Sequence, residues 1–262
     1  MRTFRLCYRL LLLAVGTIVL EAVLLIGKLF LCFAAGWRIR WRNVLVQTWA
    51  QMVALIVNMK VHAQGQPPKP PFYLVSNHLS YFDVLAYFTQ LHCIFVAKAE
   101  LASWPFFGFL AKSANTLFID RANKKDIPRI NAQIEKAIHE SDGVIVFPES
   151  TSSKGSEILP FKSPLLEYAA ARQFPVSYAT IQYRTGAADL PAHLSVCWWG
   201  EMTFAGHFLD LLKLSKIDAT ITFGPTTVRG DDRKKIAQEL WDRLNRQFEP
   251  TVNPERDSLA IR

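Results

Sequence analysis

The chain has 262 residues, half of them hydrophobic, and carries 30 Lys and Arg against 22 Asp and Glu, a formal net charge of +8. This length suffices for one sizeable core with a small appendage, and the mean hydropathy of +0.13 is high for a soluble enzyme. The positive balance suits an anionic partner, which is a membrane surface, a nucleic acid or a phosphorylated substrate.

The N-terminal region carries the longest apolar run, from Leu10 to Gly36, interrupted by Glu21 and Lys28. Basic residues flank both ends of the run, and two tryptophans accompany those after it: Arg2, Arg5, Arg9, Trp37, Arg38, Arg40, Trp41 and Arg42. The run is too long for the apolar part of a signal peptide and ends in no A-x-A site. We therefore expect residues 1–42 to associate with a membrane, either as one spanning helix or as a helical hairpin inserted into one leaflet.

Residues 43–71 are predicted to connect this segment to the rest of the chain. Asn43–Met59 is predominantly apolar, which indicates a helix, and Gln64–Pro71 is polar and rich in proline, which indicates a linker or turn. Residues 72–262 are then expected to form the main domain.

Short apolar runs alternate with helical patterns in this main domain. Helical spacing of apolar residues covers 130–138, and Asp231-Asp232 precedes a final helix with Ile236, Leu240 and Leu244 on one face. The expected strands are 72–75, 94–97, 116–119, 144–147, 176–183 and 219–223. This alternation predicts an α/β fold with a mixed, largely parallel sheet covered by helices.

His78 and Asp83 follow the first of these strands, in the stretch Asn77-His78-Leu79-Ser80-Tyr81-Phe82-Asp83. Five residues on a helix rotate by about 500°, which leaves two side chains roughly 140° apart, so a pairing of these two requires a turn. A carboxylate bonded to one ring nitrogen would orient the imidazole as a proton acceptor for an alcohol. In an alternative interpretation, Ser80 and Asp83 form a helix-capping box and His78 is a turn residue.

Three later segments also place polar groups at strand ends. Arg121, at the end of Phe118–Arg121, could bind a phosphate or carboxylate, and Lys162 lies between apolar residues in Leu159–Pro164. Between them, Glu149-Ser150-Thr151 opens a hydroxyl-rich stretch that ends at Gly155 and could bind polar groups through side chains and loop amides. Taken singly, each segment is weak evidence: Arg121 could be an ordinary exposed arginine after a strand, and the hydroxyl-rich stretch an ordinary turn.

Together and in this order, the blocks resemble those of the glycerolipid acyltransferase family, whose bacterial type member is 1-acylglycerol-3-phosphate acyltransferase. His78 to Asp83 resembles the H-x4-D block, Phe118–Arg121 the second, and Phe147–Thr151 with Pro160–Lys162 the third. Phe174-Pro175-Val176 is similar to the fourth block, and the resemblance covers roughly residues 45–225. It implies an acyltransferase domain over 72–262 that moves a fatty acyl group from acyl-CoA or acyl-carrier protein to a lysolipid hydroxyl.

The resemblance also implies roles for residues. His78 and Asp83 would be catalytic, while Arg121, Glu149, Ser150, Thr151 and Lys162 would bind the acceptor. No bound cofactor or metal is expected, since the four scattered cysteines show no metal-ligand spacing and suit a reducing, cytoplasmic domain. The expected partners are membrane lipids, the lysolipid and the acyl donor, without nucleic acid, at an inner or plasma membrane.

Two departures from the family pattern concern the acceptor. Ser150 stands where the third block usually has glycine, and Ser152-Ser153 replace a basic residue that often follows the threonine. Since that basic residue helps bind phosphate in relatives, lyso-ornithine lipid or another lysolipid is the alternative to 1-acylglycerol-3-phosphate. A membrane-anchored thioester hydrolase and a non-catalytic lipid-binding protein are the alternatives of other classes; no G-x-S-x-G element is present.

Overall fold

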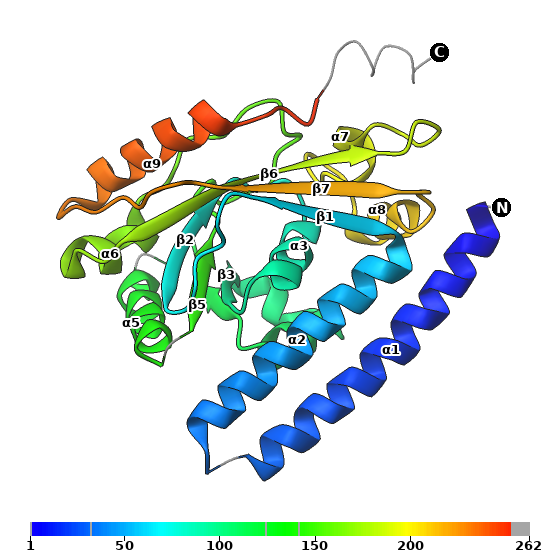
Figure 1. Ribbon diagram of the computed structural model, residues 1–262, viewed down its shortest axis with the longest axis horizontal. Helices are drawn as coiled ribbons and strands as arrows, with labels where there is room; N and C mark the ends of the chain where they lie inside the picture. Colours follow the sequence, from blue (N-terminus) through cyan, green and yellow to red (C-terminus); the bar gives the residue numbers. More distant parts are fainter. Residues whose placement is uncertain (1, 32, 124, 141, 253–262) are drawn as a thin grey trace.

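The computed structural model describes residues 2–252 except 32, 124 and 141. An α/β body carries a two-helix hairpin at its N-terminal side (Figure 1). The helices are α1 (Arg2–Phe30), α2 (Ala35–Val57), α3 (Phe82–Gln90), α4 (Phe107–Ser113), α5 (Asp126–His139), α6 (Glu167–Arg172), α7 (Ala192–Ser195), α8 (Phe204–Leu211) and α9 (Arg233–Gln247), with short 3-10 helices at Ala99–Ser103 and Pro164–Leu166.

One sheet holds the body together, with the strand order β1-β7-β6-β2-β5-β3-β4. The strands are β1 (Met59–Gln64), β2 (Phe72–Ser76), β3 (Ile94–Lys98), β4 (Leu117–Ile119), β5 (Gly143–Val146), β6 (Val176–Thr185) and β7 (Ile217–Phe223). β6 and β7 pair antiparallel and the other neighbours pair parallel, so the predicted mixed, largely parallel sheet is confirmed. The carboxyl ends of β2, β3, β4, β5 and β6 therefore meet at one edge, where α/β proteins place their sites.

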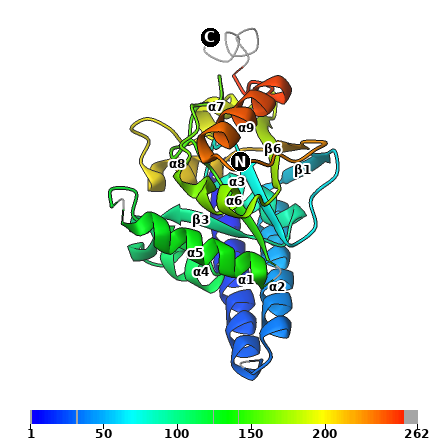
Figure 2. The same cartoon turned by 90° about the vertical axis from the view of Figure 1, so that its left-hand side faces the viewer.

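Side chains of alternate residues along the strands pack into two hydrophobic cores, one on each face of the sheet. In β2, Phe72 and Leu74 pack with α2, α3 and α8, whereas Tyr73 and Val75 pack with α5, α6 and α9. Both faces are covered by helices, with α5 and α6 on one side of β2 and β5 and α3 on the other (Figure 1); Figure 2 shows the molecule from the side of α5 and α6. This double covering explains why β2 and β5 are buried along their whole length and read as continuous apolar runs.

The strands and the two helices expected in the main domain are present, with ends that differ by up to four residues. The final helix begins as predicted, because the Asp232 carboxylate accepts the backbone N–H groups of Lys234 and Lys235 at 2.7 and 3.1 Å. The helix expected over Asn43–Met59 instead starts at Ala35 and stops at Val57, where Asn58 takes a left-handed conformation with φ of 56°. Residues 59–64 form β1, an edge strand with mostly exposed side chains that the sequence analysis missed.

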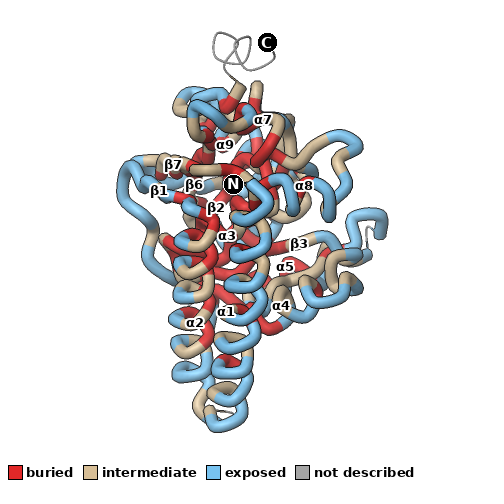
Figure 3. Tube along the Cα trace, turned by 90° about the vertical axis from the view of Figure 1, so that its right-hand side faces the viewer, coloured by how far each residue is buried: buried red, intermediate tan, exposed pale blue. Residues whose placement is uncertain are grey.

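The α1–α2 hairpin packs along one side of the body. Small residues let the two helices approach: a Cβ atom at Gly27 would lie 1.9 Å from the Trp41 ring nitrogen, and one at Gly16 would lie 2.4 Å from the Met52 sulfur. A buried ion pair of 2.5 Å between Arg42 and Asp142 fixes the N-terminal half of α2 to the body. Figure 3 shows that most of α1 and the tip of the hairpin are exposed.

By length and composition α1 could cross a membrane, and only 11% of its most apolar stretch is buried. Its exposed apolar side chains include Leu11, Ile18, Ile26, Leu29 and Phe30. Of the cysteines, Cys93 and Cys197 are buried and free and Cys7 is exposed and free, while Cys32 lies outside the described residues.

Candidate active site

The turn between β2 and α3 is fastened to the neighbouring strand β6 by Asn77. Its side-chain amide donates to the Ile181 carbonyl at 3.0 Å and accepts the Ile181 N–H at 2.8 Å. Asn77 thereby continues the β2–β6 ladder by one residue with its side chain, and its own backbone is free to turn. The following residue, His78, leaves the sheet at this fixed point.

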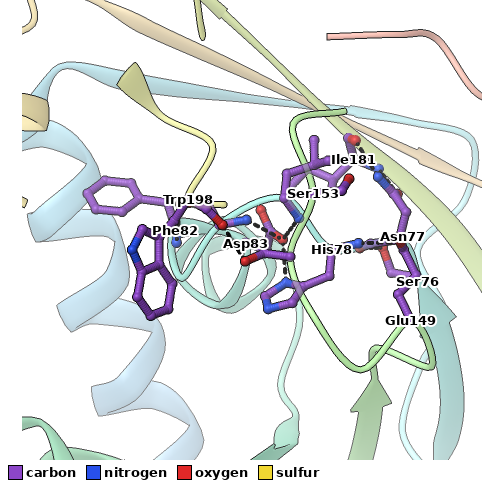
Figure 4. A network of polar contacts seen from close by, with 12 residues as sticks. Ser76, Asn77, His78, Phe82, Asp83, Glu149, Ser153, Ile181 and Trp198 are labelled. Atoms are coloured by element: carbon purple, nitrogen blue, oxygen red, sulfur yellow. Dashed lines mark hydrogen bonds and ion pairs between the residues drawn. The ribbon is translucent and has the colours of Figure 1, made fainter. Parts of the chain in front are cut away.

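The turn brings His78 and Asp83 together (Figure 4). Nδ1 of His78 lies 2.8 Å from Oδ2 of Asp83, whose side chain has no exposed surface, while 22% of the His78 side chain is exposed. The same Oδ2 accepts the backbone N–H groups of Leu79 at 2.7 Å and Ser80 at 3.1 Å. Since Nδ1 faces the carboxylate, Nε2 is the nitrogen available to a substrate hydroxyl.

The capping interpretation of this turn also holds in part. The Ser80 hydroxyl accepts the backbone N–H of Phe82 at 3.2 Å, and Asp83 accepts the N–H of Ser80. The helix α3 starts at Phe82 with Tyr81 as its N-cap, so the capping box is incomplete, but the carboxylate that accepts the Ser80 N–H also receives the imidazole.

The end of β5 supports His78 from the other side. The His78 N–H donates to Oε1 of Glu149 at 2.8 Å, and the Ser153 N–H donates to the His78 carbonyl at 3.0 Å. The His78 ring stacks on Phe147 with centroids 4.2 Å apart and planes 14° apart. Backbone and ring of His78 are therefore both held, which limits the entropy that a reaction would have to remove.

Glu149 is nearly buried, with 3% of its surface exposed. Its second oxygen, Oε2, accepts the Leu159 N–H at 3.0 Å, so each carboxylate oxygen has a backbone donor. Burial raises the pKa of Glu149 to about 8, against the opposing effect of the two N–H donors and with a smaller contribution from the charge of Asp83. In this structure Glu149 links the loop of His78 to that of Leu159. That Glu149 contacts the lipid head group stays a prediction.

The other predicted binding residues lie at the same edge of the sheet and differ in their contacts with the loops. The guanidinium of Arg121, after β4, donates to the backbone carbonyl of Ser150, which joins the ends of β4 and β5. Thr151 and Lys162 are exposed, and the Lys162 N–H is held by the Pro148 carbonyl at 2.9 Å. The structure thus brings Arg121, Ser150 and Glu149 into one connected loop system around His78, with Thr151 and Lys162 on its outer surface.

The hydrogen-bond partners of two tyrosines near this site gave no signal in the sequence. The Tyr183 hydroxyl donates to Oδ1 of Asp83 at 2.8 Å, across 100 residues of sequence. The Tyr81 hydroxyl lies 2.9 Å from Nδ1 of His207, a buried histidine whose pKa is lowered by desolvation. Tyr183, in an apolar strand, looks like any core aromatic residue, and the partner of Tyr81 is 126 residues away, so only the tertiary structure reveals these contacts. No group of three or more metal-binding side chains gathers within the described residues.

Comparison with known proteins shows which protein family the chain resembles. A family model described as "Acyltransferase" matches residues 58–182. Lyso-ornithine lipid O-acyltransferase of Brucella abortus is 29% identical over 229 residues, covering 82% of this chain and 84% of that protein. 1-Acyl-sn-glycerol-3-phosphate acyltransferase of Neisseria gonorrhoeae is 30% identical over 181 residues, covering 68% and 71%.

A solved structure agrees on the fold. The crystal structure of the 1-acyl-sn-glycerophosphate acyltransferase PlsC from Thermotoga maritima superposes with a TM-score of 0.66 at 19% identity, covering 100% of this chain and 99% of that one. Fold and matched sequence together define an α/β acyl-transferring enzyme. The chain belongs to the acyltransferase family, which confirms the family, fold class and enzyme type expected from the sequence.

Ser150 occupies a backbone conformation that explains the glycine usual in the third block. Its φ of 64° is in the left-handed region, which costs a residue with a side chain about 1–2 kcal/mol. Replacing Ser150 by glycine removes this cost but adds about 0.5–1 kcal/mol of chain entropy in the unfolded state. The contact with Arg121 uses the backbone carbonyl, so it survives the substitution.

We predict that Ser150→Gly folds with unchanged or slightly raised stability. Ser150→Val is expected to lower the free energy of unfolding by about 1–2 kcal/mol, because a β-branched residue fits this conformation poorly. Urea unfolding in detergent, with both variants beside the wild type, measures the difference. A glycine variant that is less stable than the valine variant would refute this interpretation of the loop.

Proposed function

We propose that this enzyme transfers a fatty acyl group from an acyl thioester to the hydroxyl of a lysolipid, with His78 and Asp83 as its catalytic residues. The observation that carries the proposal is the 2.8 Å contact between Nδ1 of His78 and Asp83, at the carboxyl edge of the sheet. The contact leaves Nε2 as the proton acceptor, and the partial exposure of the ring leaves room for a substrate.

The proposed reaction is direct transfer without an acyl-enzyme. Nε2 of His78 takes the proton of the lysolipid hydroxyl as its oxygen attacks the thioester carbonyl carbon. The tetrahedral intermediate then collapses, the carbon–sulfur bond breaks, and the thiolate leaves with the proton returned by the imidazolium. Asp83 holds the ring and stabilises its positive charge during the transfer, and such a general base typically contributes about 10²–10⁴ in rate.

For the acceptor, we propose lyso-ornithine lipid ahead of 1-acylglycerol-3-phosphate. Four relatives named lyso-ornithine lipid O-acyltransferase match 75–84% of the chain at 26–29% identity. The two serines that replace the basic residue are engaged within the protein: the Ser152 hydroxyl donates to the Trp198 carbonyl and the Ser153 N–H to the His78 carbonyl. Neither offers a positive charge to a phosphate. Arg121, Glu149, Ser150, Thr151 and Lys162 remain the proposed acceptor-binding residues.

Purified enzyme in lipid–detergent micelles can be given labelled acyl-CoA or acyl-carrier protein with a panel of lysolipids, and the products identified by mass. We expect acylation of lyso-ornithine lipid to exceed that of 1-acylglycerol-3-phosphate at least tenfold, with His78→Ala and Asp83→Asn each losing about 10²-fold or more. Acyl transfer by His78→Ala at a rate near that of the wild type would refute the proposed mechanism. Release of free fatty acid without any acceptor would instead identify a thioester hydrolase.

The N-terminal hairpin is proposed to insert into one leaflet without spanning the bilayer. At the start of α1, Arg5 donates to the Lys213 carbonyl at 2.7 Å, and Arg9 donates to the Leu212 and Leu214 carbonyls at 3.0 and 2.7 Å. Towards its end, Lys28 donates to the Ser113 carbonyl at 2.5 Å. Both ends of α1 thus bond to the α/β body, which a helix leaving its N-terminus on the far side of a membrane could not do.

The exposed side of this hairpin has the composition of a membrane-contacting surface. Phe30 and Phe33 at the tip are 79% and 100% exposed, and Phe106 and Phe109 of the α4 region are half-exposed. Arg40 lies over the ring of Trp37, a pairing suited to the head-group layer. We propose that the α/β body faces the cytoplasm, where the acyl donors are. The division of the chain into a membrane segment (1–42), a connecting segment (43–71) and an acyltransferase domain (72–262) also stays a proposal.

An epitope placed before Met1 tests this topology in a bacterial host. In inverted inner-membrane vesicles, protease should remove it together with a second epitope placed after Arg262, because both ends of the chain lie on the cytoplasmic side. In spheroplasts both should be protected. Removal of the N-terminal epitope alone in spheroplasts would establish a spanning helix and contradict the proposal.

A further inference from the structure

Tyr183 lies where β6 extends past the end of β2. In the ladder Ser76 pairs with Ala179, so Tyr183, four residues further along β6, stands beside the turn that carries His78. Its backbone pairs with Ala219 of β7, and its N–H donates to the Thr251 hydroxyl at 3.3 Å. The side chain is fully buried. Tyr183 is therefore held by its place in the sheet and by the contact of its backbone with Thr251.

The hydroxyl of Tyr183 completes the coordination of Asp83. Oδ2 of Asp83 receives three donors, namely Nδ1 of His78 and the N–H groups of Leu79 and Ser80. Oδ1 receives the Tyr183 hydroxyl at 2.8 Å, the one donor to this oxygen found among the described residues. Without it, a fully buried carboxylate oxygen would lack a partner, which is costly for a charged group.

The other titratable groups near Asp83 come from four elements. They are His78 on the turn itself, Glu149 after β5, Tyr87 on α3 and Cys197 after α7. The same burial raises the pKa values of Tyr183 and Cys197 well above their ordinary values, so the phenol keeps its proton and remains a donor. None of these groups supplies a positive charge other than His78, which leaves the stabilisation of the carboxylate to hydrogen bonds.

We propose that Tyr183 is a positioning residue for the acyl transfer, which fixes Asp83 through Oδ1 so that Oδ2 points at His78. This inference rests on the catalytic roles proposed above for His78 and Asp83. The hydroxyl fixes the rotation of the carboxylate about its terminal bond and shares its negative charge. Loss of the hydroxyl leaves that charge less stabilised, so we expect the acid limb of the plot of kcat against pH to lie at higher pH.

The test is Tyr183→Phe, with Tyr73→Phe as its matched control. Tyr73 is equally buried and stands on the adjoining strand β2, but its hydroxyl donates to the neutral Leu165 carbonyl at 2.6 Å on the opposite face of the sheet. For Tyr183→Phe we expect kcat to fall about tenfold, as for the loss of one hydrogen bond to a charged group. The KM values for both substrates should stay unchanged. The acid limb of the plot of kcat against pH should move up by about one pH unit. Tyr73→Phe should leave that limb in place.

A second substitution keeps the test valid if Tyr183→Phe does not fold. Replacing Tyr183 by 3-fluorotyrosine gives a stronger donor of nearly the same size, and the acid limb should then move to lower pH. An unchanged limb in both variants would overturn the inference, since a tyrosine that serves packing alone would alter stability and not the limb. His78→Ala is assayed in parallel: if it is inactive while the limb does not move, this inference fails alone, and if it is active, the catalytic proposal fails with it.

Discussion

A carboxylate with no exposed surface holds four hydrogen-bond donors at the centre of this molecule. Asp83 receives His78, two backbone N–H groups and the hydroxyl of Tyr183. A buried charge is tolerated only when its acceptor sites are filled, and this requirement fixes the geometry of the whole turn. The turn can satisfy Asp83 only if β2, β6 and α3 are in place, so the position of His78 depends on the complete sheet.

The sheet topology explains why distant residues serve one site. Parallel neighbours bring the ends of β2, β5, β3 and β4 to a single edge, and β6 runs in the same direction beside β2. Glu149 then reaches the His78 backbone, and Arg121 reaches the loop of Ser150. The hairpin is bonded to the same body through Arg9, Lys28 and Arg42. Its exposed apolar surface and the site are therefore parts of one rigid arrangement, which suits a substrate that is itself a membrane lipid.

Local patterns made part of this structure predictable from the sequence. The five-residue spacing of His78 and Asp83 ruled out a shared helix face and required the turn that is present, and the apolar runs marked the buried strands. β1 escaped because it is a short edge strand with few buried side chains, whose parallel partner β7 lies more than 150 residues away. Tyr183 escaped for a similar reason, since its hydroxyl is matched to Asp83 only by the register of β6 on β2. A serine at a position where the family usually has glycine was a visible sign of the unusual backbone at Ser150. Its left-handed φ could be seen only in the structure.

The protonation of His78 tests the central claim most directly. In enzyme labelled with ¹⁵N-histidine, with His78→Gln used to assign the signal, NMR spectra recorded where the imidazole is neutral report which ring nitrogen carries the proton. The arrangement around Asp83 predicts a proton on Nδ1 and a free lone pair on Nε2, ready for a substrate hydroxyl. A proton on Nε2 in the neutral ring would contradict it, because His78 could then neither donate to Asp83 nor accept a proton from the lysolipid.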